Sequence, residues 1–411
     1  MRGFAHSSRS FAGVSPASLP DALRCGERVY LSAAHARGAD GGVAGIGDAA
    51  AQTHAALDRL EAALDGVGGS LRDLTKLTTC IVDRGFRAEV YRAIAQRLPG
   101  VRPVSTGLVV AGLSAPEMIV QIDAEAAIPR LAPHRVRPYA FDDWHGQGFA
   151  WEGCMAISTQ DEIFLRGQTG GRLDHSGSVG GGRAVNDAAE QADLALTNMR
   201  TLLEEAGSSL REVCKITVYV SDRAYRSGVY PVIGRHFGDV HPVSTGVVTT
   251  AFARPEIVVE IDAVVVKSAA GPHRRLRTYH TSAARYGAQS QPLDARFCMA
   301  VVAGDRILLR GQTGMGLDEK LYGAGDAVAQ AEQAMNNVET LLDEAGSGIG
   351  EVVKATVYVT DRDYLEGVIA SVLARFGASL PTFTSVIVKG LASPDLLMEV
   401  DIAADRRKGA S

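Results

Sequence analysis

The sequence predicts an α+β fold of three tandem modules, with mixed sheets packed inward about a pseudo-threefold axis and helices outside. Two observations carry this prediction. One helix–strand junction occurs three times, with Lys76, Lys215 and Lys354 separated by 139 residues each time. Within each repeat the two helices can cover only one face of the sheet, so the other two sheets are the natural cover for the second face. The same spacing relates further positions: Asp48, Asp187 and Asp326; Asp83, Asp222 and Asp361; Pro103, Pro242 and Pro381; and Asp123, Asp262 and Asp401.

The repeat also sets the domain boundaries. We expect module 1, which is degenerate, at residues 1–128, module 2 at 139–267 and module 3 at 278–406. Each module is long enough for a core of its own, and the period is far longer than that of a solenoid repeat. The Pro-, His- and Arg-rich stretches 129–138 and 267–277 are expected to be linkers.

Each module is expected to begin with a short apolar strand, followed by a Gly-rich loop and a long helix. These first strands are expected at 29–34, 163–167 and 307–311. In module 2, apolar residues recur at helical spacing over 187–206. Asn186 or Asp187 is a suitable N-cap for this helix, and Gly207 is expected to end it. Modules 1 and 3 carry an aspartate at the corresponding start, Asp48 and Asp326.

A β-branched strand comes next and stops at an Asp-Arg pair, which is Asp83-Arg84, Asp222-Arg223 or Asp361-Arg362. A second helix and two closing strands complete each module. The closing strands are expected at 106–110 with 118–124, 245–249 with 257–265, and 384–388 with 396–403. In module 2, Ile257, Val259 and Ile261 alternate with Val258, Glu260 and Asp262, which is the period of a strand with one buried face.

Composition excludes several classes of protein. The chain is 46% hydrophobic and 22% charged, as expected of a globular protein, and its net charge of −5 with no basic run argues against a nucleic-acid partner. Five scattered cysteines without a C-x-x-C pair favour reduced thiols and a cytoplasmic location. No apolar leader and no run of 18 apolar residues occurs, so we expect neither secretion nor a membrane partner.

Two blocks of module 2, Gln191 to Gly207 and Val213 to Asp222, and their counterparts Gln330 to Gly346 and Val352 to Asp361 in module 3, resemble the Rid family (YjgF/YER057c/UK114). The resemblance covers essentially the whole chain. It implies a chorismate-mutase-like trimeric fold with clefts between adjacent modules. It also implies small-molecule chemistry without a cofactor, which in one branch is the hydrolysis of reactive enamines and imines.

The resemblance transfers only in part to this chain. The deaminating branch has a carboxylate-binding Arg two residues after a Pro, where this chain has Ser105, Ser244 and Phe383. Serine cannot supply the bidentate pairing of a guanidinium. The family's acid in the last strand matches Glu260 and Glu399, whereas module 1 has Gln121.

The family's Ser-Gly-Gln motif in the first strand becomes Arg166-Gly167-Gln168 and Arg310-Gly311-Gln312. We hypothesise that Arg166 and Arg310 bind the substrate's anionic group from the opposite wall. A structural ion pair with Asp262 or Asp401 is the alternative. Gln168 and Gln312 could hold a ligand carbonyl or cap a turn. Ser105, Ser244 and Thr245 are candidate hydrogen-bond donors to the ligand, since no matched His–Asp pair makes a catalytic triad with either serine.

Glu260 and Glu399 are the candidate acid–base residues, because a carboxyl in a cleft can have a pKa near neutrality. A solvated strand face is the alternative for both. The histidines show no metal-ligand spacing, so no metal is expected, and His134 and His273 in the linkers are expected to be solvated.

The leading hypothesis is a Rid-like enzyme that hydrolyses, deaminates or tautomerises an enamine, an imine or a related carboxylate-bearing metabolite at inter-module clefts. The substrate is expected to be small and anionic, and the chain a self-contained pseudo-trimer whose further assembly is left open. Two alternatives are a non-catalytic metabolite-binding protein and another hydrolase or lyase on the same scaffold.

Overall fold

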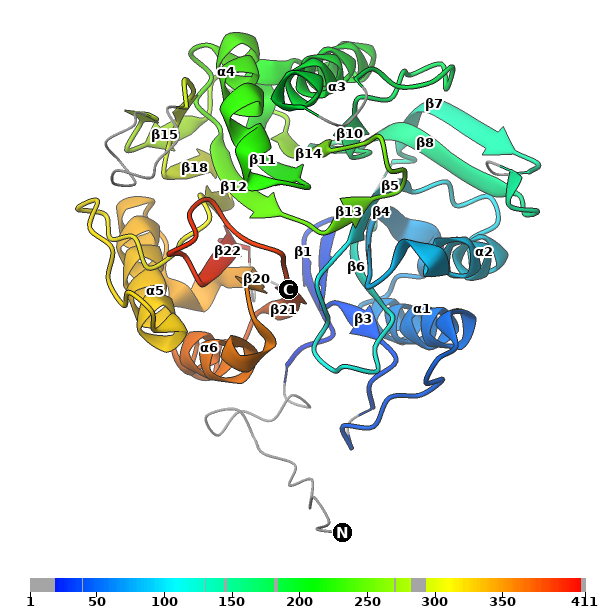
Figure 1. Cartoon of the computed structure of the whole chain (residues 1–411), viewed down its shortest axis with the longest axis horizontal. Coiled ribbons are helices and arrows are strands. Elements are labelled where there is room, and N and C mark those ends of the chain that lie inside the picture. The colour runs from blue at the N-terminus through cyan, green and yellow to red at the C-terminus, as the bar shows by residue number, and fades with distance from the viewer. Residues whose placement is uncertain are drawn as a thin grey trace.

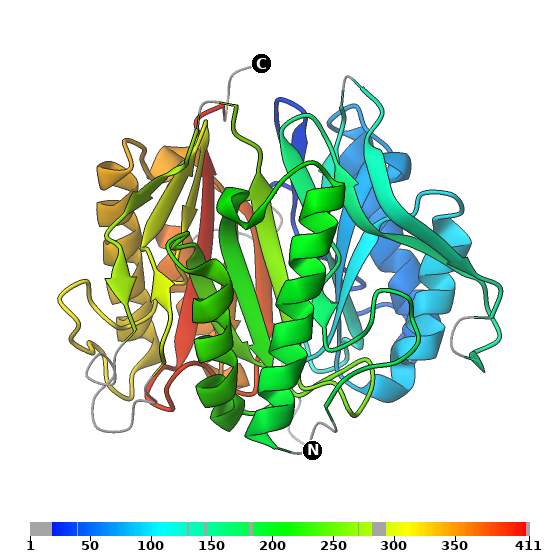
Figure 2. The same ribbon diagram turned by 90° about the horizontal axis from the view of Figure 1, so that it is seen from above.

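The computed structural model describes residues 19–38, 40–129, 131–143, 146–180, 184–269, 271–281 and 293–407. Three sheets surround a common centre, and the helices lie on the outside, as Figure 1 shows. Seen at right angles to that view, the strands run behind the outer helices (Figure 2). The predicted fold of three α+β modules is therefore confirmed. None of the described helices is long and apolar enough to cross a membrane.

In each module short strands precede a long helix, and a central strand, a second helix and the closing strands follow, with the number of short strands differing between modules. Module 1 consists of β1 (Ala22–Cys25), β2 (Arg28–Leu31), β3 (Ala34–His35), α1 (Ala49–Asp65), β4 (Leu74–Ile81), α2 (Arg87–Arg97), β5 (Val104–Val109) and β6 (Val120–Ala127). Module 2 consists of β7 (His134–Phe141), β8 (Trp151–Ser158), β9 (Glu162–Leu165), β10 (Gln168–Thr169), α3 (Val185–Glu205), β11 (Val213–Val220), α4 (Arg226–Phe237), β12 (Val243–Val248), β13 (Ala251–Phe252) and β14 (Val259–Val266). Module 3 consists of β15 (Arg274–Leu276), β16 (Tyr279–His280), β17 (Arg296–Phe297), β18 (Ala300–Ala303), β19 (Arg306–Leu309), α5 (Ala327–Glu344), β20 (Val352–Val359), α6 (Arg362–Ala374), β21 (Thr382–Ile387) and β22 (Met398–Asp405).

Each sheet is mixed. The second helix of each module connects the one parallel pair, which is β4–β5, β11–β12 or β20–β21. The last strand pairs antiparallel to the other side of the central strand and lies in the middle of the sheet. Strand β14 is buried along nearly its whole length on both faces, because helices cover one face and the neighbouring modules cover the other.

The long helices begin where the sequence predicts in two modules. The carboxylate of Asp48 accepts a hydrogen bond from the backbone at the start of α1, and Asp326 does the same for α5. In module 2 the prediction is wrong, because α3 starts at Val185 after Ala184, without a side-chain cap. Gly207 does follow the helix, with a φ of 77° that favours glycine.

The expected linkers contain β-structure. Strand β7 starts within 129–138 and pairs with β8, and β15 lies within 267–277 and pairs with β18. His273 is therefore buried, with Nε2 2.7 Å from the carbonyl oxygen of Val266, so the expectation of a solvated side chain is wrong for it. His134 is exposed, as expected.

A ring of ion pairs joins the modules in the cyclic order 1, 2, 3, 1. Lys76 of module 1 binds Asp262 of module 2 at 2.9 Å, Lys215 binds Asp401, and Lys354 binds Asp123 at 2.9 Å. Each aspartate also accepts a hydrogen bond from a threonine of the same preceding module: Thr106, Thr245 and Thr384. The three lysines, the three aspartates and Thr384 line a central cavity of about 170 Å³. Because removing one partner would leave a buried charge, the ring fixes how the modules meet.

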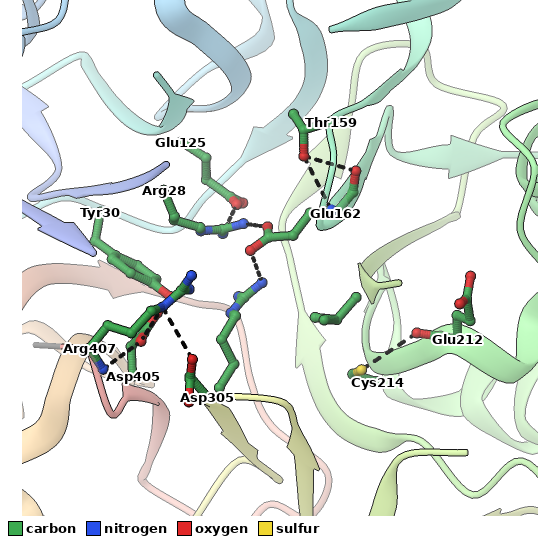
Figure 3. A network of polar contacts seen from close by, with 12 residues as sticks. Arg28, Tyr30, Glu125, Thr159, Glu162, Glu212, Cys214, Asp305, Asp405 and Arg407 are labelled. Atoms are coloured by element: carbon green, nitrogen blue, oxygen red, sulfur yellow. Dashed lines mark hydrogen bonds and ion pairs between the residues drawn. The ribbon is translucent and has the colours of Figure 1, made fainter. Parts of the chain in front are cut away.

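One end of the axis shows how fusion breaks the symmetry. Arg28, Glu162 and Arg306 occupy the same position at the start of β2, β9 and β19, and all three are buried. Glu162 binds both arginines, and Arg28 also binds Glu125 (Figure 3). Identical subunits would place three like charges here, so this arrangement needs non-identical modules.

Candidate functional site

Equivalent residues meet at two module interfaces. Site II lies between modules 2 and 3, in a cleft lined by Arg226, Tyr230 and Ser244 from module 2 and by Tyr279, Arg310 and Glu399 from module 3. Its cavity volume is about 30 Å³, so the cleft is narrow. Site I is the corresponding set between modules 1 and 2: Arg87, Tyr91, Ser105, Tyr139, Arg166 and Glu260.

The two glutamates are buried acids. Glu399 is 4% exposed and Glu260 is 5% exposed, so the alternative of a solvated strand face is wrong. Burial raises the pKa of Glu399 to about 7, against the opposing effect of Arg310. Burial and the neighbouring Asp262 raise the pKa of Glu260 to about 8. Both carboxyls can therefore hold a proton near neutral pH.

A glycine makes room for each acid. A Cβ atom on Gly311 would meet Oε1 of Glu399 at 1.7 Å, and one on Gly167 would meet Oε1 of Glu260 at 2.0 Å. Real Cβ atoms do not approach oxygen so closely, so the carboxyls occupy space that any other residue would fill. The Arg-Gly sequence thus places a cation beside an acid.

The arginines that the sequence singled out lie at the sites. Arg310 follows β19, with its guanidinium 5.7 Å from the ring centre of Tyr279, and Arg166 lies 6.0 Å from that of Tyr139. The alternative ion pairs with Asp262 and Asp401 are not formed, because those carboxylates bind the lysines of the central ring.

A second pair of arginines was missed. Arg226 is the first residue of α4, 5% exposed, with its guanidinium 4.4 Å from the ring centre of Tyr230 and donating to that hydroxyl at 3.0 Å. Arg87 holds the same place on α2 over Tyr91, and burial and Arg166 both lower its pKa. A signal was present, because residues 87 and 226 are 139 apart and both are Arg, whereas module 3 has Leu365.

The candidate hydroxyl groups lie on two different faces of their strands. Ser244 lines site II with its Oγ buried, and no hydrogen-bond partner for it occurs in the described part of the chain. Ser105 lies at site I, 3.3 Å from the Tyr91 hydroxyl. The expectation for Thr245 is wrong, because alternate residues of a strand face opposite sides. Its hydroxyl donates to Asp401 at 3.0 Å in the central ring.

The glutamines act locally. Nε2 of Gln168 donates to the carbonyl oxygen of Arg166 at 2.6 Å, and Gln312 does the same to Arg310. Of the two interpretations, the structure favours the capped turn. This turn holds each arginine backbone in place next to the acid.

The third interface, between modules 3 and 1, is closed. Phe383 accepts a backbone hydrogen bond from Ala33 at 3.0 Å and donates one to Oγ of Ser32 at 2.9 Å. Gln121 stands where the acids stand and donates to the carbonyl oxygen of Ser385 at 3.2 Å. Neither arginine nor glutamate occupies the equivalent positions there.

Within the described ranges, no group of three His, Cys, Asp or Glu side chains is placed to hold a metal ion.

Comparison with known proteins places this geometry in context. The profile of the Ribonuc_L-PSP family, described as Endoribonuclease L-PSP, matches residues 14–128, 154–267 and 288–405. A RutC family protein of Pyrococcus abyssi (strain GE5 / Orsay) is 30% identical over 144 residues, which are 35% of this chain and 97% of that protein. The 2-iminobutanoate/2-iminopropanoate deaminase of Escherichia coli (strain K12) is 35% identical over 85 residues, or 20% of this chain and 66% of that enzyme.

A crystal structure of a chorismatase superposes with a TM-score of 0.53 at 15% sequence identity. The alignment covers 81% of this chain and 93% of that chain. At this identity the similarity concerns the fold alone.

Proposed function

The chain belongs to the Ribonuc_L-PSP (Rid) family, with three copies of the family module, and from this premise we propose that it is an enzyme acting on small carboxylate-bearing imines or enamines at sites I and II. The reaction is hydrolysis to a carbonyl compound and ammonia, or tautomerisation between enamine and imine. One observation carries the proposal: each site combines a buried glutamic acid, whose pKa lies near neutrality, with two guanidinium groups.

The arginines bind and orient the substrate. A carboxylate next to an imine carbon forms charge-assisted hydrogen bonds with a guanidinium, which replaces the missing family arginine. In the folded chain, Arg310 at site II and Arg166 at site I lie close enough to the glutamate to affect its pKa. A substrate carboxylate bound to either arginine would therefore hold the imine group at the glutamate. Fixing this geometry supplies a large part of catalysis.

The glutamic acid moves the proton. At site II, protonated Glu399 donates its proton to the imine nitrogen, which makes the imine carbon more electrophilic. Water then attacks that carbon and gives a proton to the carboxylate. Returning this proton to nitrogen makes ammonia the leaving group, and the hydroxyl proton passes to the carboxylate as the carbonyl group forms, which restores the protonated acid. For an enamine, the same acid protonates the β-carbon to give the imine.

The size and charge of the sites favour a small molecule. The family description names an endoribonuclease, but the chain has a net charge of −5 and no basic run, which argues against a polynucleotide substrate. Two working sites per chain are expected, because the third interface lacks both the acid and the arginines.

The test is imine consumption by the purified chain. An amino-acid oxidase generates the 2-imino acid, and the imine that remains is trapped with semicarbazide. We expect the wild type to remove imine and the double variant Glu260→Gln/Glu399→Gln to lose at least about 100-fold in rate, the range of general acid catalysis. Gln121→Ala, at the closed interface, is the matched control and should stay active.

Wild-type protein that consumes imine no faster than buffer would reject the enzymatic proposal. If 2-imino acids or their products still raised the melting temperature, the non-catalytic metabolite-binding alternative would stand.

A further inference from the structure

Site II has a cation on each wall. Arg226 comes from helix α4 of module 2, and Arg310 comes from the turn after β19 of module 3, and both line the same cleft. Among the described lining residues, Glu399 is the sole acid. Two guanidinium groups thus face one carboxyl whose pKa is about 7, which leaves the lining with an excess of positive charge.

Arg226 is an unusual residue for a protein interior. It is 5% exposed, and no carboxylate of the described residues lies within ion-pair distance of it. Among the described residues, its polar contacts are with Tyr230: the guanidinium lies over the ring and donates one hydrogen bond to the hydroxyl. A guanidinium has five N–H donors, and burying it without a counter-charge is costly unless a ligand supplies acceptors.

A second polar group at site II also lacks an internal partner. Ser244 is 7% exposed, and its buried Oγ has no hydrogen bond within the described ranges. Ser244 and Gly246 lie on the same face of β12, and Gly246 is in contact with Arg226. The wall opposite the acid therefore offers both a cation and a hydroxyl to a ligand.

The three interfaces of the chain provide an internal comparison. Site I repeats the set of two arginines and one acid. Arg87 and Arg166 come from different modules, and Arg166 and Glu260 both affect the pKa of Arg87. At the closed interface both arginines are absent together, replaced by Leu365 and Ser32, and the acid is absent with them. The two cations and the acid thus occur as one unit. A fold-stabilising role for the helix arginine would not require this association.

We infer that sites I and II each take a ligand with two anionic groups, a small dicarboxylate or its imino derivative, with one carboxylate on each arginine wall. This inference rests on the proposal that these sites bind the substrate. The carboxylate beside the reacting carbon binds Arg310 or Arg166, next to the acid. The distal carboxylate binds Arg226 or Arg87 together with the neighbouring serine.

The binding of succinate and butyrate, which both have four carbon atoms but differ by one carboxylate, tests the inference without any reaction. Isothermal titration of the wild type at low ionic strength should show succinate binding at least about tenfold more tightly than butyrate, since a charge-assisted contact supplies that much. Two succinate molecules should bind per chain. In Arg87→Gln/Arg226→Gln the preference should fall below about threefold, while Arg235→Gln, an exposed arginine of the same helix, should keep it.

Equal affinity for succinate and butyrate in the wild type would overturn the inference, whatever the variants do. A native circular-dichroism spectrum is required of Arg87→Gln/Arg226→Gln. If that variant unfolds, Arg87→Met/Arg226→Met, which also lacks the positive charges, takes its place. A full succinate preference in a folded variant would also overturn it.

The imine assay separates this inference from the proposed function. Turnover of monocarboxylate and dicarboxylate imines at equal efficiency would leave the function standing and reject the dianionic substrate. A preference for succinate without turnover of any imine would support the dianionic ligand and reject the proposed function.

Discussion

Glu399 lies directly against the Cα atom of Gly311, so that a methyl group on residue 311 would come within 1.7 Å of its carboxyl oxygen. The pair comes from two distant parts of module 3, the turn after β19 and the last strand β22. Gly167 and Glu260 repeat the contact in module 2. The position of each acid therefore depends on the absence of a side chain in the Arg-Gly turn.

Gly311→Ala should displace the Glu399 carboxyl and remove most of the activity of site II. A shift of about 1 Å in a catalytic group can reduce the rate roughly 100-fold. The rate is best measured in a Glu260→Gln background, where site II alone is working. Gly348→Ala is the matched control, since nothing lies within 4 Å of its added methyl group. An unchanged rate in Gly311→Ala would show that the contact has no role in placing the acid.

The raised pKa values of the acids also predict how stability depends on pH. The folded state keeps a proton on Glu260 up to a pH of about 8, whereas the unfolded chain releases it near 4.5. Between these values the folded state binds more protons, so the free energy of unfolding falls as pH rises. Glu260→Gln removes this effect.

We expect Glu260→Gln to gain stability relative to wild type between pH 5 and pH 9, on the order of 3 kcal/mol or more. Urea denaturation at the two pH values measures it. The exposed Glu366→Gln is the control and should change stability equally at both pH values. A pH-independent difference for Glu260→Gln would mean that the carboxyl ionises in the folded protein as it does in the unfolded chain.

A glutamate at the closed interface should destabilise the protein. Gln121→Glu places a carboxylate, 2% exposed, against the carbonyl oxygen of Ser385. We expect a loss of about 2–5 kcal/mol at pH 8, and a smaller loss at pH 5, where a protonated carboxyl can donate to that oxygen. Thermal unfolding measures both. A stable variant with a third working site would contradict the assignment of this interface as closed.

Much of the fold follows from the repeat. Lys76, Lys215 and Lys354 recur at one spacing, and the structure joins each of them to the next module around the axis. The same reasoning brought Arg310 and Glu399 to one interface, because the family resemblance aligned the turn and the last strand. Strand alternation places neighbouring residues on opposite sides, but it does not say which of the two sides faces the cleft. Ser244 faces the cleft, and its neighbour Thr245 faces the axis.

The rest of the site depended on contacts between distant segments. Arg87 and Arg226 reach the sites from helix starts, and helical periodicity says nothing about a neighbouring module. Strand β7 was missed because it contains Pro138 and the polar or charged residues His134, Arg135 and Arg137, which give a weak strand pattern. Its pairing with β8 stabilises it. The two arginines could have been found by asking which residues recur in modules 1 and 2 and not in module 3.

The most direct test is the pH–rate profile of the two variants that leave one working site each. Protonated glutamate is the active form, so activity should be full below its pKa and lost above it. We predict that Glu260→Gln, with site II working, loses imine hydrolysis with a midpoint near pH 7. Glu399→Gln, with site I working, should lose it with a midpoint near pH 8. Identical profiles that match the wild type in both variants would contradict the account.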